Sequence, residues 1–329
     1  MKKILVIQTA FIGDVVLATA IIEKLHVYFP DAQMDFLLRK GNEGLLAGHP
    51  FLHEVLIWDK QKNKIRNLMG MGRKIRRARY DVVINVQRFA ATGLLTLFSG
   101  ARETIGFDKN PMSRWFTRRI PHIVSTSTAP LHEIDRNQEL IRHLTDAEPD
   151  RPRLYPAVAD YEKVRAYKST PYITISPASV WFTKQFPQEK WVDFIKKLPE
   201  HYTVYLLGGT GDKELCKYIA DETRAIDLSG QFSFLQSAAL MKDALMNYTN
   251  DSAPMHFASA LNAPVTAIYC STIPAFGFGP LSDKRFIVEV QEMLDCRPCG
   301  LHGYKACPMG HFNCARHIRD EQLLKTLLG

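Results

Sequence analysis

Short apolar runs alternate with amphipathic helical patterns along almost the whole chain, and this alternation constrains the fold more than any other feature. In the first helical pattern, residues 14–29, apolar side chains recur at helical spacing and Pro30 follows the end. Strands are expected at residues 3–8, 34–38, 55–57, 81–86, 172–175, 203–207, 245–248 and 265–269. Helices are expected at residues 14–29, 62–79, 89–98, 132–144, 188–198, 213–223, 235–242, 255–261 and 320–328. Such alternation is typical of βαβ units, so the sequence predicts an α/β fold with parallel sheets.

A polar, proline-rich stretch at residues 146–156 divides this alternation into two series. The chain has 329 residues, which is too long for one average domain and suits two. Stretches of this composition are typical of domain boundaries. We therefore predict two Rossmann-like, doubly wound domains, residues 1–155 and 156–329, facing a central cleft that would bind the ligand.

Composition places the chain among globular proteins rather than membrane-spanning ones. Its hydrophobic fraction is 46% and its charged fraction is 23%. Lys2 and Lys3 precede an apolar stretch that imitates a signal peptide, but Gly13 and Asp14 interrupt it. No segment reaches the roughly 18 apolar residues that a bilayer span requires. We expect a cytoplasmic protein.

The positive charge of the chain is concentrated in one tract. The net charge is +8, and residues 60–88 contain ten lysines and arginines and a single acid. The centre of the tract is formed by Arg73, Lys74, Arg76 and Arg77. A surface of this kind attracts nucleic acid or an anionic membrane. An ordinary solvated helix face is an equally good interpretation of the tract alone.

Four of the six cysteines lie close together near the end of the sequence, at Cys296, Cys299, Cys307 and Cys314. Their spacing is compatible with zinc, but it lacks the second C-x2-C pair of common zinc sites. Reduced thiols that pack a loop are the favoured interpretation, with structural zinc as the alternative.

Gly13 and Asp14 are the first candidate site residues, because they follow the first predicted strand and open a helix. Gly13 permits a tight turn or the close approach of a ligand. Asp14 would lie near a helix N-terminus directed at the cleft, either as a cap or as a functional carboxylate. The segment is not a G-x-G-x-x-G fingerprint, which disfavours a dinucleotide site in the first domain.

The loop at residues 176–187 has the composition of a phosphate-binding turn. It places small residues, Ser179, Thr183 and Lys184 between a β-branched strand and a helix. Backbone amides at a helix N-terminus favour anions, and a lysine beside them adds a positive charge. A solvated lysine is the alternative interpretation.

A second loop, at residues 250–256, would leave the same edge of the sheet. It contains Asp251, Ser252 and His256, which could hold a ribose, a phosphate or a sugar hydroxyl. An ordinary helix cap is the alternative. Residues 208–212 are rich in glycine and could either approach a nucleotide or form a plain turn.

The order and spacing of four segments resemble those of glycosyltransferase family nine, the ADP-heptose:lipopolysaccharide heptosyltransferases. The segments are Phe-Ile-Gly-Asp at 11–14, Ser-Pro-Ala-Ser-Val-Trp-Phe-Thr-Lys at 176–184, Asn-Asp-Ser-Ala-Pro-Met-His at 250–256 and the cysteine-rich tail at 296–314. The resemblance covers nearly the whole chain.

This resemblance implies a GT-B architecture in which the second domain binds the donor and the first binds the acceptor. It implies inverting transfer from an ADP-sugar without a metal or another cofactor, since neither candidate loop carries a D-x-D motif. It also implies a catalytic base at Asp14 and donor-phosphate contacts at Lys184 and Ser179. The remaining donor-side candidates are Gly13, Thr183, Gln236, Asp251, Ser252 and His256.

Two positions depart from the family pattern. Family members often carry glycine where this chain has Ala178 and Ala253. Each change adds a methyl group beside the expected phosphates, so the pose and the identity of the donor are expected to respond to these two residues.

We therefore expect transfer of heptose or a related sugar to a lipopolysaccharide core or a similar anionic glycolipid. The enzyme would be peripheral at the inner face of the cytoplasmic membrane, with Arg73, Lys74, Arg76 and Arg77 as acceptor or membrane surface, and no nucleic-acid partner is expected. Two alternatives stay open on the sequence: a non-catalytic module that binds nucleic acid or a membrane surface, and a GT-B-fold sugar epimerase or phosphorylase.

Overall fold

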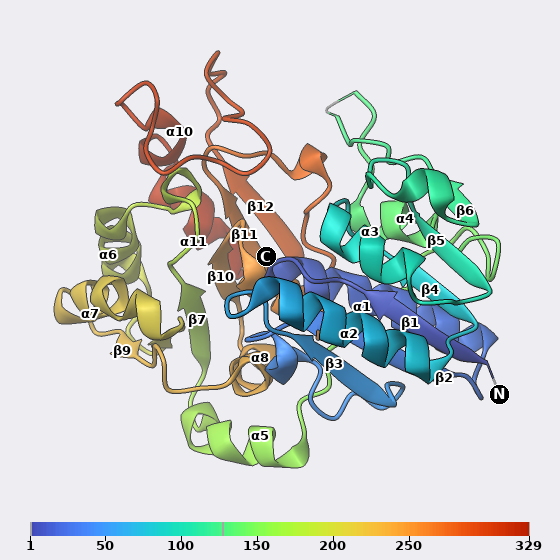
Figure 1. Cartoon of the computed structure of the whole chain (residues 1–329). Coiled ribbons are helices and arrows are strands. Elements are labelled where there is room, and N and C mark those ends of the chain that lie inside the picture. Colours follow the sequence, from blue (N-terminus) through green and yellow to red (C-terminus); the bar gives the residue numbers. More distant parts are fainter. Residues whose placement is uncertain (1, 127, 329) are drawn as a thin grey trace. The chain divides into compact units, whose positions relative to one another are not determined.

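The computed structural model describes residues 2–126 and 128–328, and the chain forms two compact units (Figure 1). Unit 1 comprises Met1–Ser125 and Leu131–Tyr155, and unit 2 comprises Thr126–Pro130 and Pro156–Gly329. Each unit has its own sheet, and helices pack against both sheets.

The sheet of unit 1 has six parallel strands in the order β3-β2-β1-β4-β5-β6. The strands are β1 (Lys3–Ile7), β2 (Gln33–Arg39), β3 (Glu54–Trp58), β4 (Val82–Asn85), β5 (Glu103–Phe107) and β6 (Arg118–Ile120). Ile4 pairs with Met34 on one side and with Val82 on the other, and all three are buried. The chain reverses its direction of winding between β1 and β4, which makes the gap between them the topological switch point.

The helices of unit 1 are α1 (Ile12–Tyr28), α2 (Lys64–Ala78), α3 (Ala90–Leu97) and α4 (Glu133–Gln138). Every residue of α1 from Val15 to Leu25 is buried. In contrast, Ile75 is the one buried residue of α2, whose remaining surface is rich in arginine and lysine. The predicted helix 132–144 is too long, because α4 ends after six residues and turns follow it.

Unit 2 repeats this architecture with the strand order β12-β11-β10-β7-β8-β9, again all parallel. Its strands are β7 (Tyr172–Ser176), β8 (Thr203–Leu206), β9 (Ile226–Asp227), β10 (Asn247–Asn250), β11 (Val265–Tyr269) and β12 (Arg285–Glu289). Its helices are α5 (Val158–Val164), α6 (Gln188–Lys197), α7 (Lys213–Asp221), α8 (Phe234–Lys242), α9 (Ala253–Ala260), α10 (Asn313–Arg316) and α11 (Asp320–Leu328). The switch point lies between β7 and β10.

Aromatic side chains in the core of unit 2 anchor the candidate loop between β7 and α6. Trp191 and Phe194 of α6 are fully buried, and the ring of Phe194 packs edge-on against Tyr248 of β10 at 4.8 Å between ring centroids. Phe186, just before α6, packs edge-on against Trp191 at 5.1 Å. Aromatic burial of this extent anchors the loop between β7 and α6 to the sheet.

Four strands of the sheets were missed by the sequence pattern: the inner strand β5 and three strands that each lie at a sheet edge, β6, β9 and β12. β6 contains two arginines in three residues, β9 has two residues, and β12 is exposed along one face. An edge strand is defined by pairing with its single neighbour rather than by an apolar run of its own. The sequence pattern therefore predicted every inner strand except β5, together with the edge strand β3.

Candidate active site

An ion pair occupies the switch point of unit 2. Lys184 lies in a short 3₁₀ turn (Phe182–Lys184) before α6, and Asp251 follows β10 directly. The ammonium of Lys184 lies 2.7 Å from Oδ2 of Asp251, and the two side chains are 15% and 9% exposed. The two predicted loops therefore do leave the same edge of the sheet, and they meet through two of the predicted residues.

Hydrogen bonds fix the carboxylate of Asp251 in place. Thr272, beyond the end of β11, donates its hydroxyl to Oδ2 of Asp251 at 2.6 Å. The backbone amide of Asp251 donates to the carbonyl of Ile268 at 3.1 Å. A buried carboxylate needs such hydrogen-bond partners to offset the loss of water around it.

The side chain of Asn250, the last residue of β10, connects the two loops through hydrogen bonds. Its side-chain oxygen accepts from the amide of Phe186 at 2.9 Å, and its side-chain nitrogen donates to the carbonyl of Pro177 at 2.7 Å. Asn250 is fully buried. The last residue of β10 therefore sets the path of the whole loop that carries Lys184.

The same two loops carry three further predicted residues: Ser179 in the loop of Lys184, and Ser252 and His256 in that of Asp251. The carbonyl of Ser179 accepts from the side chain of Gln185 at 2.6 Å, which closes the loop ahead of α6. Ser252 is the residue before α9, and its hydroxyl contacts the carbonyl of Asn250 at 3.4 Å. His256 lies in the first turn of α9 and is buried. The start of α9 thus presents backbone amides beside Asp251.

Two of the predicted donor contacts, Thr183 and Gln236, form hydrogen bonds within unit 2. Thr183 is 1% exposed, and its hydroxyl accepts from the amide of Tyr304 at 2.8 Å and from the hydroxyl of Ser271 at 2.9 Å. Its role is to anchor the turn that carries Lys184. Gln236 forms a capping box with Ser233 at the start of α8, so its side-chain oxygen is committed to the backbone of that helix.

The cysteine-rich segment packs against the turn that carries Lys184. Gly303 has a backbone φ of +76°, and a Cβ atom there would lie 2.9 Å from Oγ1 of Thr183 and 3.0 Å from Cγ of Lys184. Arg297 donates to the carbonyls of Cys270 and Thr272 at 2.8 Å each. Only glycine fits at position 303, where the conformation is left-handed and the approach is close.

The thiols of this segment are free in the structure. Burial, followed by the neighbouring Cys299, raises the pKa of Cys314 to about 12. Sγ of Cys296 lies 3.9 Å from Nε2 of His311. Within residues 2–126 and 128–328, no group of three or more His, Cys, Asp or Glu side chains has an arrangement that could hold a metal ion.

Asp14 lies at the carboxyl edge of the sheet of unit 1. It is the third residue of α1, which begins at Ile12 rather than at Asp14, and it places a negative charge in the first turn. Gly13 is inside the same helix, so the interpretation of Gly13 as a tight turn is wrong. Asp14 is only partly exposed.

A buried ion pair near Asp14 was not predicted. Glu133 and Arg136 of α4 contact each other, and their side chains are 10% and 7% exposed. Nε of Arg136 also donates to the carbonyl of Ile123 at 2.7 Å. The pKa of Glu133 is raised to about 7, mainly by burial; Arg136 and Arg88 oppose the shift, and the charge of Asp14 acts in the same direction as burial. In the sequence, Glu133 is simply an acid at the start of a predicted helix, a position where acids commonly compensate the helix dipole. No pattern therefore identified its pairing with Arg136.

The same edge carries a second unpredicted group, a cationic cluster that we define as Arg39, Lys60 and Lys64. Burial, followed by the charges of Arg39 and Lys64, lowers the pKa of Lys60 to about 8. The ammonium of Lys60 donates to the hydroxyl of Thr9 at 2.7 Å and lies 4.8 Å from the ring centre of Trp58. In the part of the chain that the structure describes, no carboxylate forms an ion pair with any of the three.

The predicted basic tract lies on α2, and its charges are exposed. Lys74 forms an ion pair with Glu54 at 2.5 Å, and Arg76 donates to the carbonyl of Phe98 at 3.4 Å. Arg73 and Arg77 are exposed. The tract is thus a broad charged surface rather than a closed site.

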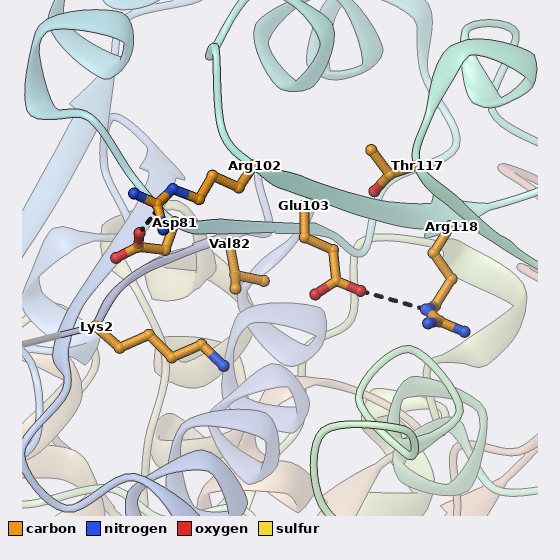
Figure 2. Close-up of a pocket in the computed structure, with 7 residues that line it drawn as sticks. All are labelled: Lys2, Asp81, Val82, Arg102, Glu103, Thr117 and Arg118. Atoms are coloured by element: carbon orange, nitrogen blue, oxygen red, sulfur yellow. Dashed lines mark hydrogen bonds and ion pairs between the residues drawn. The ribbon is translucent and has the colours of Figure 1, made fainter.

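One hollow in unit 1 lies away from these groups. It has a volume of about 700 Å³ and is lined at the amino ends of β4, β5 and β6 (Figure 2). Figure 2 shows that four of its charged side chains form two pairs, Arg102 with Asp81 and Arg118 with Glu103, while Lys2 also lines the hollow. Ligands of open α/β sheets bind at the carboxyl ends of the strands, so this hollow is not the candidate site.

Two doubly wound parallel sheets, one in each unit, are the architecture of the GT-B class of glycosyltransferase fold. A solved glycosyltransferase of family 9 from Veillonella parvula matches with a TM-score of 0.85 at 21% identity, covering 99% of this chain and 97% of that one. The structure of the ADP-heptose lipopolysaccharide heptosyltransferase II of Escherichia coli matches with a TM-score of 0.78 at 23% identity, covering 100% and 99%. The predicted fold class is confirmed.

The model of glycosyltransferase family 9 (heptosyltransferase) matches residues 68–303, so the chain belongs to this family and is a glycosyltransferase. The chain is also similar to lipopolysaccharide heptosyltransferase 1 of Pseudomonas aeruginosa, with 23% identity over 321 residues, 90% of this chain and 86% of that protein. Family membership overturns the two alternatives, a non-catalytic binding module and an epimerase or phosphorylase. No helix among the described residues is long and apolar enough to cross a membrane.

Proposed function

We propose that this enzyme transfers heptose, or a closely related sugar, with inversion from an ADP-sugar to a lipopolysaccharide core or a similar anionic glycolipid. The observation that carries the proposal is the pair of Lys184 and Asp251 at the switch point of unit 2 in a chain of this family. The names of the similar proteins support the sugar and the acceptor class.

On the donor side, the diphosphate would compete with Asp251 for the ammonium of Lys184. The two groups are 2.7 Å apart, so a phosphate oxygen that approaches Lys184 needs little movement of the lysine. The amides at the start of α9, with Ser252 and His256, would add the helix dipole. Donors of this kind stabilise negative charge that grows on the leaving diphosphate by several kcal/mol each, roughly.

The chemical step assigned to unit 1 is proton removal by Asp14. The acceptor hydroxyl attacks the anomeric carbon, the bond from that carbon to the diphosphate breaks, and the electron pair leaves with the phosphate oxygen. The hydroxyl proton passes to the carboxylate of Asp14. General-base assistance of this kind contributes about 10²–10⁴-fold to the rate. The partly exposed position of Asp14 at the carboxyl edge supports this role.

The cationic cluster of Arg39, Lys60 and Lys64 fits a negatively charged acceptor. Its members lie at the ends of β2 and β3 and at the start of α2, at the same edge of the sheet as Asp14. We propose that they bind anionic groups of the acceptor near the reacting hydroxyl, while Arg73, Arg76 and Arg77 hold the enzyme peripherally at the inner face of the cytoplasmic membrane, where anionic lipids attract basic side chains.

The test is a donor panel read by mass spectrometry. The protein is incubated with ADP-heptose, ADP-glucose and UDP-glucose, each with and without a deacylated lipopolysaccharide core fragment, and with EDTA present throughout. Transfer from ADP-heptose with inverted anomeric configuration is expected, and retention of configuration or a preference for UDP-glucose would contradict the proposal. Ala178→Gly and Ala253→Gly serve as variants that probe donor choice, since each removes a methyl group from a donor loop.

A further inference from the structure

The side chain of Phe11 is an exposed aromatic ring at the carboxyl edge of the sheet of unit 1. Phe11 follows β1 and is the N-cap residue of α1, and it is 55% exposed. A single exposed apolar side chain is ordinary on a protein surface and needs no explanation of its own. The surroundings of Phe11 are not ordinary, because its ring contacts a cationic group and lies at the start of the helix that carries Asp14.

The cationic group belongs to Arg39, the last residue of β2. Its guanidinium carbon lies 5.1 Å from the centre of the Phe11 ring, which is within the range of a cation–π interaction. Because β1 and β2 are neighbouring parallel strands, Phe11 and Arg39 leave the sheet at the same edge. Arg39 is also a member of the cationic cluster, so the ring of Phe11 adjoins that cluster.

Hydrogen bonds hold the short segment between β1 and α1. The backbone amide of Ala10 donates to Oε1 of Gln8 at 3.2 Å, and the carbonyl of Ala10 accepts from Nδ2 of Asn42 at 3.1 Å. Gln8 and Asn42 are each 2% exposed. The carbonyl of Phe11 accepts from the amide of Val15 at 3.2 Å. An aromatic ring on a segment held in this way loses little conformational freedom when a ligand covers it.

Phe11 and Asp14 occupy the N-cap and the third position of α1. Side chains at these two positions lie next to each other at a helix start, which is why such pairs form capping boxes in other helices. A ligand that covers the ring would therefore bring its rim beside the carboxylate of Asp14. The same ligand would bring a substituent on its other side beside the guanidinium of Arg39.

We propose that Phe11 is a binding residue for the acceptor: its ring stacks on the C–H face of a pyranose that carries an anionic substituent. A pyranose has an apolar face of C–H bonds and a rim of hydroxyl groups, so a flat apolar ring covers the face and leaves the rim to Asp14. The anionic substituent contacts Arg39. This inference rests on the proposed function, which assigns the acceptor to unit 1. It adds a requirement of shape to that of charge, namely an uncovered C–H face beside the negative group.

The test is the acceptor KM, measured with ADP-heptose and the deacylated lipopolysaccharide core fragment. Phe11→Ala should raise the acceptor KM about five- to tenfold and leave the donor KM unchanged. Phe11→Trp should keep the wild-type acceptor KM, whereas Phe11→Leu, which is apolar but not flat, should lose most of what Phe11→Ala loses. Phe98→Ala is the matched control, since Phe98 is 58% exposed at the end of α3 in the same unit, and it should change neither KM. A wild-type acceptor KM in Phe11→Ala or in Phe11→Leu would overturn the inference.

A second measurement does not depend on turnover. The fluorescence of Phe11→Trp should change on addition of the core fragment by more than that of the wild type, whose four tryptophans give the baseline. An equal change in both proteins would overturn the inference. If Phe11 only supports the fold, Phe11→Ala will lower the melting temperature with an unmoved acceptor KM, which also overturns it. If the wild type transfers no sugar to the fragment, the proposed function fails; if the wild type transfers sugar and Phe11→Ala keeps its acceptor KM, the inference alone fails.

Discussion

The carboxyl edges of the two sheets differ in how their charges are balanced. In unit 2, Lys184 and Asp251 form an ion pair, and the hydroxyl of Thr272 donates a hydrogen bond to the same carboxylate. In unit 1, Arg39 and Lys60 have no carboxylate partner among the described residues, and Glu133 is buried near a second acid. The paired charges of unit 2, which we call the balanced edge, suit a ligand that displaces one partner of a preformed ion pair. The unpaired charges of unit 1, the unbalanced edge, suit a ligand or a proton of opposite charge.

The largest effect is expected from Asp14→Asn. The amide keeps the shape and the place of Asp14 in the first turn of α1 but cannot accept a proton. Transfer should fall at least about 100-fold, because a general-base contribution is lost. Single-turnover kinetics with saturating donor would measure it. A rate within a few-fold of the wild type would leave Asp14 as a helix-end residue without catalytic function.

Lys184→Ala should have the next largest effect, on the donor side. The positive charge acts on both bound diphosphate and leaving diphosphate, so affinity for ADP and kcat should each fall about tenfold or more. The protein should also lose stability, since Asp251 is left buried and unpaired. The double variant Lys184→Ala/Asp251→Asn separates these effects: it should recover the melting temperature but not the affinity for ADP. Recovery of both would show that Lys184 only neutralises Asp251.

The sequence identified the charged residues that follow strongly apolar strands, and it missed those whose surroundings depend on packing between distant segments. Lys184 and Asp251 were both identified because each follows an inner strand with a strong apolar pattern, and parallel strands bring their ends to one edge. The pair of Glu133 and Arg136 was missed although a helix was predicted at residues 132–144, because its burial depends on how α4 packs, which no local pattern encodes. Lys60 was counted in the basic tract, but its burial against Trp58 depends on packing that no local pattern encodes.

Gly303→Ala tests whether ADP binding depends on the exact position of the turn that carries Lys184. The added Cβ would lie 2.9 Å from Oγ1 of Thr183, and alanine is disfavoured at a φ of +76°. We expect a loss of about 1–3 kcal/mol in the free energy of unfolding and a few-fold weaker binding of ADP. Thermal denaturation and calorimetry measure the two quantities. Gly310→Ala is the matched control, because it shares the positive φ but has open space around it, so it should affect stability alone.

The pH dependence of acceptor binding probes the unbalanced edge. Lys60 has a pKa of about 8, so it is charged below that pH and loses its charge above it. The KM for an anionic acceptor fragment should therefore rise by a few-fold between pH 7 and 9, while the KM for the donor stays level. Lys60→Arg keeps the charge and should flatten the rise. An acceptor KM that is independent of pH in the wild type would remove Lys60 from the acceptor site.

The smallest effect is expected from the basic surface of α2. Replacing Arg73, Arg76 and Arg77 with glutamine should raise the apparent KM for a lipid-embedded acceptor and leave a soluble acceptor fragment almost unaffected. Added salt should have the same effect on the wild type, because exposed charges are screened beyond about 8–10 Å near physiological ionic strength. Equal losses on both acceptors would place these arginines in the fold or the acceptor site rather than at a membrane surface.

The division of labour between the two edges is tested most directly by the affinity for ADP, measured by calorimetry in Asp14→Asn and Lys184→Ala. We expect Asp14→Asn to bind ADP as the wild type does although it transfers sugar slowly, and Lys184→Ala to bind ADP at least about tenfold more weakly. Wild-type affinity in Lys184→Ala, together with weakened binding in Asp14→Asn, would contradict this division.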